Sequence, residues 1–352
     1  MATDSLGRSY PEGEAEFRSW FRSDAGCLDY LDWLRWPGGF VCPYCEDDSW
    51  RLADGRHKCK GCKRVVSATA GTIFHGTRTP LTLWFAAAWE MMTSKSGVPA
   101  LKLQKTLGIG SYQTAWAMLH RYRTVMVLPG RELLTGDVEA DETFFGGVKT
   151  GGKRGRGSPG KSMVIVAVEL RAPKGLGRAR LGVIPNAQSA TLKPWLEANV
   201  AAGSTLITDG LLSYQSATAA AFTHKAINVK GSGRPAHESL PGCHRVMSLF
   251  KRWLLSTAQG GISHQHLQSY LDEYAFRFNR RRAHHRGLLF QRLLLQAVQG
   301  APRTYRSLVA LPDPHERNGG VSTGEKRVRP ATLELAVSEH PWRALPALPD
   351  RS

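Results

Sequence analysis

Hydrophobic and polar positions follow a helical period in the first third of the chain. Apolar residues recur every three or four positions, as Trp84, Phe85 and Ala88 do, and this spacing predicts amphipathic helices. The predicted helices cover Glu14–Phe21, Cys27–Leu34, a stretch opening at Pro80, a short segment before Gly108, and Ala115–Arg123 behind a Ser111–Thr114 cap. We expect the apolar side chains of the first two helices to pack on the segment that follows them.

From Asp137 onward the pattern changes to that of strands. Three strands are predicted in succession at Val138–Phe145, Lys161–Leu170 and Arg178–Ile184. Next come a helix at Thr191–Val200, strands at Ser204–Thr208 and Thr223–Val229, and helices at Cys243–Ser256, Ser263–Arg277 and Leu288–Val298. The order β-β-β-α-β-(α)-β-α is that of the ribonuclease H-like fold, which predicts an α/β domain of this class.

Composition indicates a class of binding partner only through the charge of the chain. The 352 residues contain 47 Lys+Arg against 29 Asp+Glu, a net charge of +18. A surplus of this size favours a polyanion such as nucleic acid, although a basic surface that only aids solubility is the alternative. With 42% hydrophobic and 22% charged residues, the chain has a globular rather than a disordered composition. We expect a soluble cytoplasmic protein, because no secretion signal and no apolar run of membrane-spanning length occurs.

Four of the six cysteines form two CxxC pairs, Cys42 with Cys45 and Cys59 with Cys62. Each pair makes a tight turn that directs two thiolates at one point, and two such turns complete the tetrahedral site that Zn²⁺ prefers. Two disulfides or four free thiols are the alternatives, and disulfides are disfavoured in a cytosolic chain with no secretion signal. The pattern predicts a zinc ribbon with short strands and a structural metal.

The helix that begins near Ser111 follows a short helix and a turn containing Gly108, the order of a helix-turn-helix. In that arrangement Tyr112, Gln113 and Thr114 occupy the positions from which side chains contact bases. An ordinary pair of antiparallel helices is the alternative interpretation.

Two aspartates are predicted to meet in the α/β domain. Asp141 lies inside the first strand and Asp209 ends the fourth, and these strands are neighbours in a ribonuclease H-like sheet. Alternation places Glu139 on the face of Asp141 and Glu142 on the other. Paired carboxylates suit Mg²⁺ or Mn²⁺, which can catalyse phosphodiester cleavage as a two-metal site. The alternative for Asp209 is a simple Asp-Gly turn.

Basic side chains cluster in segments near these acids. The Gly-rich segment between the first two strands is predicted to contact phosphate, or else to be a solvated hairpin tip; its basic residues are Lys149, Lys153, Arg154 and Arg156. Further phosphate contacts are predicted for Arg252, Arg280, Arg281 and Arg282.

Taken together, these patterns predict a multidomain chain. We expect N-terminal helices and the zinc ribbon in residues 1–76, a helix-turn-helix-like DNA-binding region in 77–130, and the catalytic domain in 131–300. Residues 301–352 contain several prolines and little periodicity, which predicts a loosely ordered C-terminal tail.

Several segments, in order, resemble IS1595-family (ISXO2-like) insertion-sequence transposases. The resemblance covers roughly residues 12–298. It rests on the cysteine ribbon with Ser67–Phe74, on Val138–Gly147, on Thr208–Gly210, and on His244–Leu255 continuing into His266–Arg281.

The resemblance implies a DDE-type transposase of a bacterial cytoplasm, bound to the nucleoid when on DNA. Its implied partners are double-stranded DNA, as terminal inverted repeats and target, and further copies of itself. Asp141 and Asp209 match the first two acids of the family, and Lys251 matches its basic residue. The implied reaction is metal-dependent hydrolysis at the element's ends, followed by attack of the freed 3′-OH on target DNA.

The third catalytic position, seven residues before Lys251, is His244 instead of the Glu of the general pattern. Seven residues are two helical turns, so His244 and Lys251 share a face. An imidazole suits Mn²⁺ or Zn²⁺ better than Mg²⁺. Glu238 and Glu139 are rival ligands, and a helix-capping role for His244 is the alternative. The substitution keeps open an inactive transposase remnant or a DNA-binding regulator, and a structure-specific nuclease could use the same fold.

Overall fold

The computed structural model describes residues 2–4, 7, 9–145, 161–173, 175–218, 221–227, 239–258 and 262–310. Three segments that the sequence analysis singled out lie outside these ranges: the basic segment from Lys149 to Arg156, Glu238, and residues 311–352. Among the helices described, none combines the length and the apolar character needed to cross a membrane.

Six helices share one apolar core. They are α1 (Glu14–Trp20), α2 (Asp24–Arg35), α3 (Leu81–Thr93), α4 (Ala100–Leu107), α5 (Tyr112–Arg123) and α11 (Arg286–Ala297). Phe21 packs edge-on against Phe85 of α3 at 4.7 Å between ring centroids, and it also contacts Phe290 of α11. Phe21 and Leu31, which we expected to pack on the ribbon, therefore lie instead in the core that these helices share. This core joins segments that the sequence analysis assigned to three separate domains.

The cysteine-containing segment forms a small antiparallel sheet. Its strands are β3 (Ser49–Arg51), β4 (His57–Cys59) and β5 (Val65–Val66), in that spatial order. His57 of β4 is fixed at both ring nitrogens, by the Ser49 hydroxyl at 2.9 Å and by Asp32 of α2 at 2.7 Å. These bonds attach the small sheet to the preceding helix.

The second half of the chain builds a five-stranded mixed sheet in the order β10-β9-β6-β7-β8. The strands are β6 (Asp137–Phe145), β7 (Ser162–Leu170), β8 (Leu176–Ile184), β9 (Thr205–Thr208) and β10 (Thr223–Ala226). β7 is antiparallel to both of its neighbours, β6 and β8, whereas β9 runs parallel to both β6 and β10. The predicted adjacency of the first and fourth strands of this sheet is confirmed.

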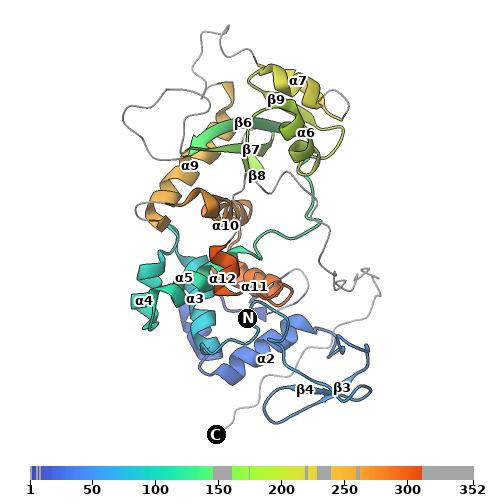
Figure 1. Cartoon of the computed structure of the whole chain (residues 1–352), viewed down its shortest axis with the longest axis vertical. Coiled ribbons are helices and arrows are strands. Elements are labelled where there is room, and N and C mark those ends of the chain that lie inside the picture. Colours follow the sequence, from blue (N-terminus) through green and yellow to red (C-terminus); the bar gives the residue numbers. More distant parts are fainter. Residues whose placement is uncertain are drawn as a thin grey trace. The chain divides into compact units, whose positions relative to one another are not determined.

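Helices cover both faces of this sheet (Figure 1). On one face α9 (Pro241–Ala258) and α10 (Leu267–Asn279) pack against Val164, Val166 and Val168 of β7. On the other face α6 (Ser189–Glu197) and α7 (Leu212–Thr218) pack against Ile165 and Ala167. Every side chain from Ser162 to Glu169 in β7 is buried, which explains why the sequence of this strand is almost continuously apolar.

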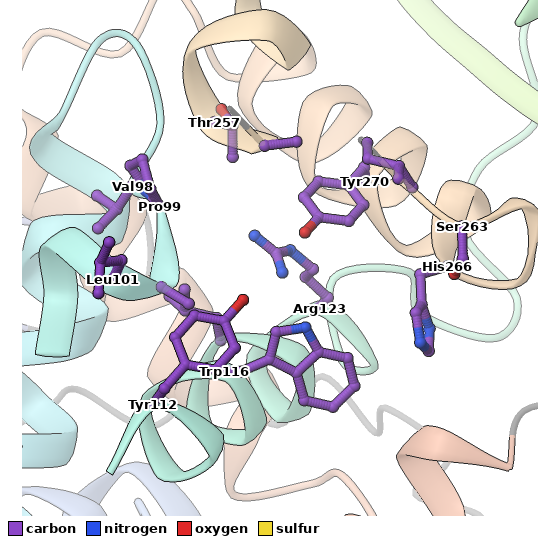
Figure 2. A pocket seen from close by; sticks show the side chains of 14 residues that line it. Val98, Pro99, Leu101, Tyr112, Trp116, Arg123, Thr257, Ser263, His266 and Tyr270 are labelled. Atoms are coloured by element: carbon purple, nitrogen blue, oxygen red, sulfur yellow. The ribbon is translucent and has the colours of Figure 1, made fainter. Parts of the chain in front are cut away.

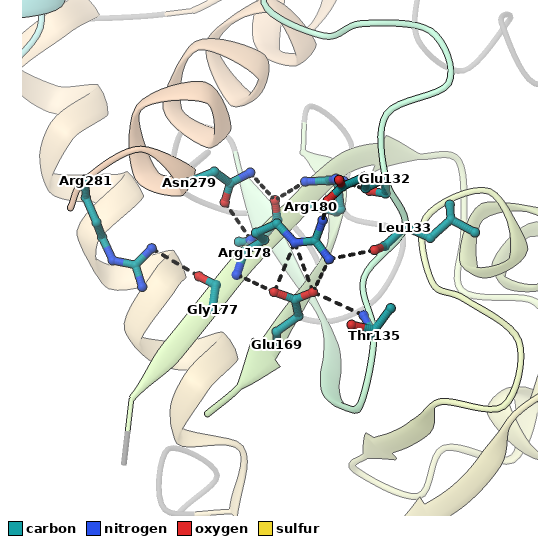
Figure 3. Close-up of polar contacts among 10 residues, drawn as sticks. Glu132, Leu133, Thr135, Glu169, Gly177, Arg178, Arg180, Asn279 and Arg281 are labelled. Atoms are coloured by element: carbon teal, nitrogen blue, oxygen red, sulfur yellow. Dashed lines mark hydrogen bonds and ion pairs between the residues drawn. The ribbon is translucent and has the colours of Figure 1, made fainter. Parts of the chain in front are cut away.

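A polar network fastens the segment before β6 to the sheet (Figure 3). The guanidinium of Arg178 in β8 donates to Glu169 of β7 at 2.6 Å and to Glu132 at 2.7 Å. The Thr135 N–H also donates to Glu169 at 3.1 Å. Asn279, at the end of α10, exchanges two hydrogen bonds with the backbone of Ala179. The network joins the segment before β6 to β7 and β8, and β8 to the end of α10.

Short elements complete the described residues. They are β1 (Ala2–Thr3), β2 (Ser9–Tyr10), the 3-10 turn η1 (His264–His266) and α12 (Tyr305–Val309). The helix α12 lies inside the segment predicted to be a loose tail, and its Leu308 is buried.

Candidate functional site

The four CxxC cysteines converge on one point. Their Sγ atoms all lie within 4.8 Å of one another, with 3.7 Å between Cys42 and Cys62 and 3.4 Å between Cys45 and Cys59. All four are free thiols, so the disulfide alternative does not hold. A tetrahedral site with Zn–S bonds of about 2.3 Å requires sulfur–sulfur distances near 3.8 Å. The cluster therefore fits a structural zinc ion.

Strand register brings the two predicted aspartates to the same level of the sheet. Asp137 pairs with Thr205 and Glu139 with Ile207 across the β6–β9 ladder. Continuing this register by two residues puts Asp141 level with Asp209, which follows the last residue of β9. The Asp209 carboxylate accepts from the Leu211 N–H at 3.1 Å, which fixes the turn that ends the strand.

Asp141 lies in an environment that disfavours its charge. Its side chain is 23% exposed, and Glu142, Asp209 and Glu139 lie close enough to interact with it electrostatically. Burial first, and then the neighbouring carboxylates, raise the pKa of Asp141 to about 7. A carboxyl group in this setting is stabilised as an anion by a bound cation.

The α9 helix presents His244 to this carboxylate. The His244 Nε2 atom lies 3.8 Å from Asp141 Oδ2. Glu139 lies two residues before Asp141 on β6, and its side chain is buried. The Glu139 carboxylate accepts a hydrogen bond at 2.9 Å from the N–H of Cys243, in the first turn of α9. A Cβ atom at Gly242 would lie 2.7 Å from Glu139 Oε2, so only glycine allows this approach. Glu139 thus caps the helix instead of facing the aspartates as a free ligand.

The other two candidate groups on these elements have different surroundings. Lys251, exposed on α9, holds its Nζ atom 5.4 Å from the ring centroid of Phe145 at the end of β6. Glu142 accepts a hydrogen bond from the Tyr214 hydroxyl of α7, on the opposite face of the sheet from α9. The predicted division of Glu139 and Glu142 between the two faces is confirmed. Alternation alone could not identify Tyr214 as the partner.

The aspartate site is more open than the cysteine site. Within the part of the chain that the structure describes, only the four cysteines bring three or more potential ligand atoms within 4.8 Å of one another. Asp141, Asp209 and His244 do not form so tight a group.

The predicted DNA-binding residues that the structure describes fall into three groups: those at the start of α5, two exposed arginines, and two arginines bound within the fold. Tyr112, Gln113 and Thr114 lie at the start of α5, where the Ser111 side chain caps the helix by accepting from the Thr114 N–H. Tyr112 and Gln113 are exposed, as are Arg252 and Arg282.

Arg280 and Arg281 are instead bound within the fold. The Arg280 guanidinium stacks 3.9 Å above the Phe276 ring and donates to the Phe276 carbonyl, and burial lowers its pKa to about 10. Arg281 stacks on Phe278 and donates to the Gly177 and Phe278 carbonyls. These contacts stabilise the junction of α10 with β8, and contact of either residue with phosphate stays a prediction.

Comparison with known proteins identifies the class. The sequence model of the ISXO2-like transposase domain matches residues 133–279, and that of the transposase zinc-ribbon domain matches residues 22–65. An uncharacterized protein in transposable element ISH50 of Halobacterium salinarum is 26% identical over 279 residues, which cover 73% of this chain and 91% of that protein. An uncharacterized transposase-like protein of Haemophilus influenzae is 34% identical over 97 residues, covering 28% of this chain and 77% of that protein. No solved structure matches.

The ribbon and the α/β domain thus belong to a transposase of insertion elements. Specifically, the chain is a member of the IS1595 family of ISXO2-like transposases. A zinc ribbon joined to a transposase domain indicates DNA as its partner.

Proposed function

We propose that the chain is a DDE-type transposase whose α/β domain is ribonuclease H-like. It would bind the terminal inverted repeats of an insertion sequence in double-stranded DNA, cleave at the ends, and join the 3′-OH ends to target DNA. The strand order β10-β9-β6-β7-β8 supports the ribonuclease H-like assignment, because three antiparallel strands are followed by two parallel ones.

The electrostatic state of Asp141 carries the proposal. A half-buried carboxyl group with three neighbouring acids is destabilising unless a cation neutralises it, and perturbed carboxylates of this kind concentrate at catalytic sites. Its neighbour in the register is Asp209, the second acid of the family pattern. The donor set therefore fits a divalent cation.

Each residue has a distinct role in this proposal. Asp141 and Asp209 would offer carboxylate oxygens to the metal, and His244 an imidazole nitrogen that favours Mn²⁺ over Mg²⁺. Bound metal would supply water activation and stabilisation of the leaving oxygen in phosphodiester cleavage. Glu139 would orient His244 through the first turn of α9, and Lys251 would bind a phosphate near the cleaved bond.

DNA would be held by two further surfaces. On the ribbon, the half-exposed ring of Trp50 lies within 6 Å of two ammonium groups, those of Lys58 and Lys63. Basic and aromatic side chains in contact are suited to nucleic acid. In α4 and α5, the capped start of α5 would act as the second helix of a helix-turn-helix. Bridging two DNA ends would require more than one copy of the chain.

The test uses the DNA that flanks the coding region. Wild-type protein should nick a duplex containing an element end in the presence of Mn²⁺, whereas Asp141→Asn and Asp209→Asn should bind the duplex without nicking it. Unchanged cleavage by either variant would refute the proposed site. Joining of the cleaved 3′-OH end to a target plasmid separates a transposase from a structure-specific nuclease. Binding by the wild-type protein without cleavage would identify a regulator or an inactive copy.

A further inference from the structure

A pocket of about 280 Å³ lies between α5 and the end of α9 with the start of α10, away from the aspartates (Figure 2). The start of α4 closes one side of it. Tyr112 and Trp116 of α5 line it together with Arg123, His266 and Tyr270. Its volume is near the lower limit of small-molecule sites, which suits one small planar group.

The guanidinium of Arg123 points into this pocket (Figure 2). The residue is only 2% exposed, and its Nε–H donates to the fully buried Glu273 at 2.8 Å. The Arg123 Cζ atom lies 4.1 Å from the centroid of the Tyr270 ring. Among the described residues, no hydrogen-bond acceptor lies in reach of its Nη1 and Nη2 groups. The four N–H bonds of these two groups can therefore be donated to an acceptor that enters the pocket.

Aromatic rings surround the same space in fixed positions. Trp116 stacks on the buried His120 ring at 4.0 Å between centroids, and His120 in turn meets the Tyr270 ring edge-on at 5.7 Å. Burial, with the nearby Arg123 charge, holds the pKa of His120 well below its usual value, so His120 supports Trp116 as a neutral ring. Tyr112, at 47% exposure, lies at the solvent side of the pocket. The pocket therefore combines flat aromatic walls with one hydrogen-bond donor group, the guanidinium of Arg123.

The charge of the pocket selects against a phosphate group. Arg123 is the single Lys or Arg residue among those lining it, and Glu273, which also lies beside Arg277, offsets part of its positive charge. A phosphate would meet only this one, partly offset cation, and it could not stack on the aromatic walls. A neutral planar group with carbonyl or ring-nitrogen acceptors could stack on the aromatic walls and accept hydrogen bonds from the Nη groups of Arg123. Guanine fits this description, because its O6 and N7 atoms accept a bidentate arginine.

We propose that this pocket binds a single unstacked nucleobase of the bound DNA, with guanine preferred. The inference rests on the proposed function, because it requires DNA at the start of α5, where Tyr112 leads into the pocket. The base would enter between Tyr112 and Trp116 and accept hydrogen bonds from Arg123. Removing a base from a duplex costs a few kcal/mol, so an already unpaired base should bind best.

The experiment compares three DNA duplexes of equal length with the full chain. One is fully paired, one carries a single unpaired guanine, and one carries an abasic nucleotide at the same place, which reproduces the bulge without the base. Fluorescence anisotropy should give tighter binding to the guanine bulge than to the abasic bulge, by about fivefold or more, as base–aromatic stacking contributes elsewhere. Free dGMP at micromolar concentration should not remove this preference, and its removal would indicate a mononucleotide site instead.

Two variants and one control locate the effect. Tyr112→Ala removes the exposed aromatic ring at the solvent side of the pocket. Arg123→Lys keeps the positive charge beside Glu273 but removes the planar guanidinium. Both variants should lower the ratio of the affinity for the guanine bulge to that for the abasic bulge toward one. Leu128→Ala removes an exposed apolar side chain, at 38% exposure, that does not line this pocket, and should keep the ratio.

Two outcomes would overturn the inference, and they are distinguishable from failure of the proposed function. Equal binding of the guanine and abasic bulges by a protein that still cleaves element ends refutes the pocket alone, as does a preference that survives Tyr112→Ala. Failure to bind any duplex refutes both.

Discussion

Replacing Asp141 by Asn should stabilise the protein in the absence of divalent metal, although it removes a proposed catalytic group. The pKa of Asp141 in the folded chain is raised to about 7, from 3.8 for an ordinary aspartate. A raised carboxyl pKa means that the folded state binds the proton more tightly than the unfolded state. Stability from this group is therefore full below pH 4 and is lost as the pH rises from 4 to 7.

The size of the effect follows from the same pKa difference. At pH 8 the whole difference applies and corresponds to about 4 kcal/mol, whereas at pH 5 less than half of it applies. Because the Asp141 side chain is 23% exposed, solvent screening lowers these values, and we expect the variant to gain about 2 kcal/mol at pH 8. An asparagine has nearly the same shape and no charge, so packing should be preserved.

The assay is thermal unfolding of both proteins at pH 5 and pH 8, with Mg²⁺ and Mn²⁺ removed by dialysis. A chelator is unsuitable because it would also strip zinc from the cysteine cluster. The midpoint of Asp141→Asn should exceed that of the wild type by more at pH 8 than at pH 5. Added Mn²⁺ should then stabilise the wild type and leave the variant unchanged. Equal midpoints at pH 8, or equal stabilisation of both proteins by Mn²⁺, would refute this account of the site.

Three further predictions test other parts of the structure. His244→Ala should lower Mn²⁺-dependent nicking by about tenfold or more, and His244→Glu should restore it with a preference for Mg²⁺; a nicking rate insensitive to both changes would remove His244 from the site. Cys59→Ser should lose bound zinc, measured by atomic absorption, while Cys243→Ser in α9, outside the cysteine cluster, keeps it; retained zinc in Cys59→Ser would contradict a four-cysteine site. Glu273→Gln should lower the free energy of unfolding in urea by about 3 kcal/mol, because it leaves Arg123 buried without its counter-charge; a loss below about 1 kcal/mol would show that water reaches the pair.

Features of the fold that depend on short-range patterns could be predicted from the sequence. The two CxxC turns specify a zinc cluster because each places its thiolates within a few residues. Alternation along β6 separated Glu139 from Glu142, since side chains in a strand point to opposite faces. The order of strands then made β6 and β9 neighbours, which was enough to pair Asp141 with Asp209.

Features that depend on which apolar faces meet could not be predicted in this way. The periodicity of α11 shows that it has a buried face, but not that this face joins α2 and α3 instead of the sheet. For the same reason, a run of arginines in the sequence does not show whether the side chains bind phosphate or pack within the fold. Arg280 and Arg281 resemble phosphate-binding residues in sequence. In the structure, each guanidinium stacks on the ring of a phenylalanine three or four residues earlier in α10 and donates to backbone carbonyls.

The same consideration changes the meaning of the surplus of positive charge. Part of it is internal, because Arg123 and Arg277 are buried and lie beside Glu273. The aspartate site itself is acidic, so DNA phosphates would be repelled from it until a cation is bound. In the proposed mechanism, activity requires the local charge that lowers stability, and a substitution that relieves the repulsion at Asp141 also removes a proposed metal ligand. Stability and cleavage should move in opposite directions at this residue, which is the behaviour expected of a site built for catalysis instead of for folding.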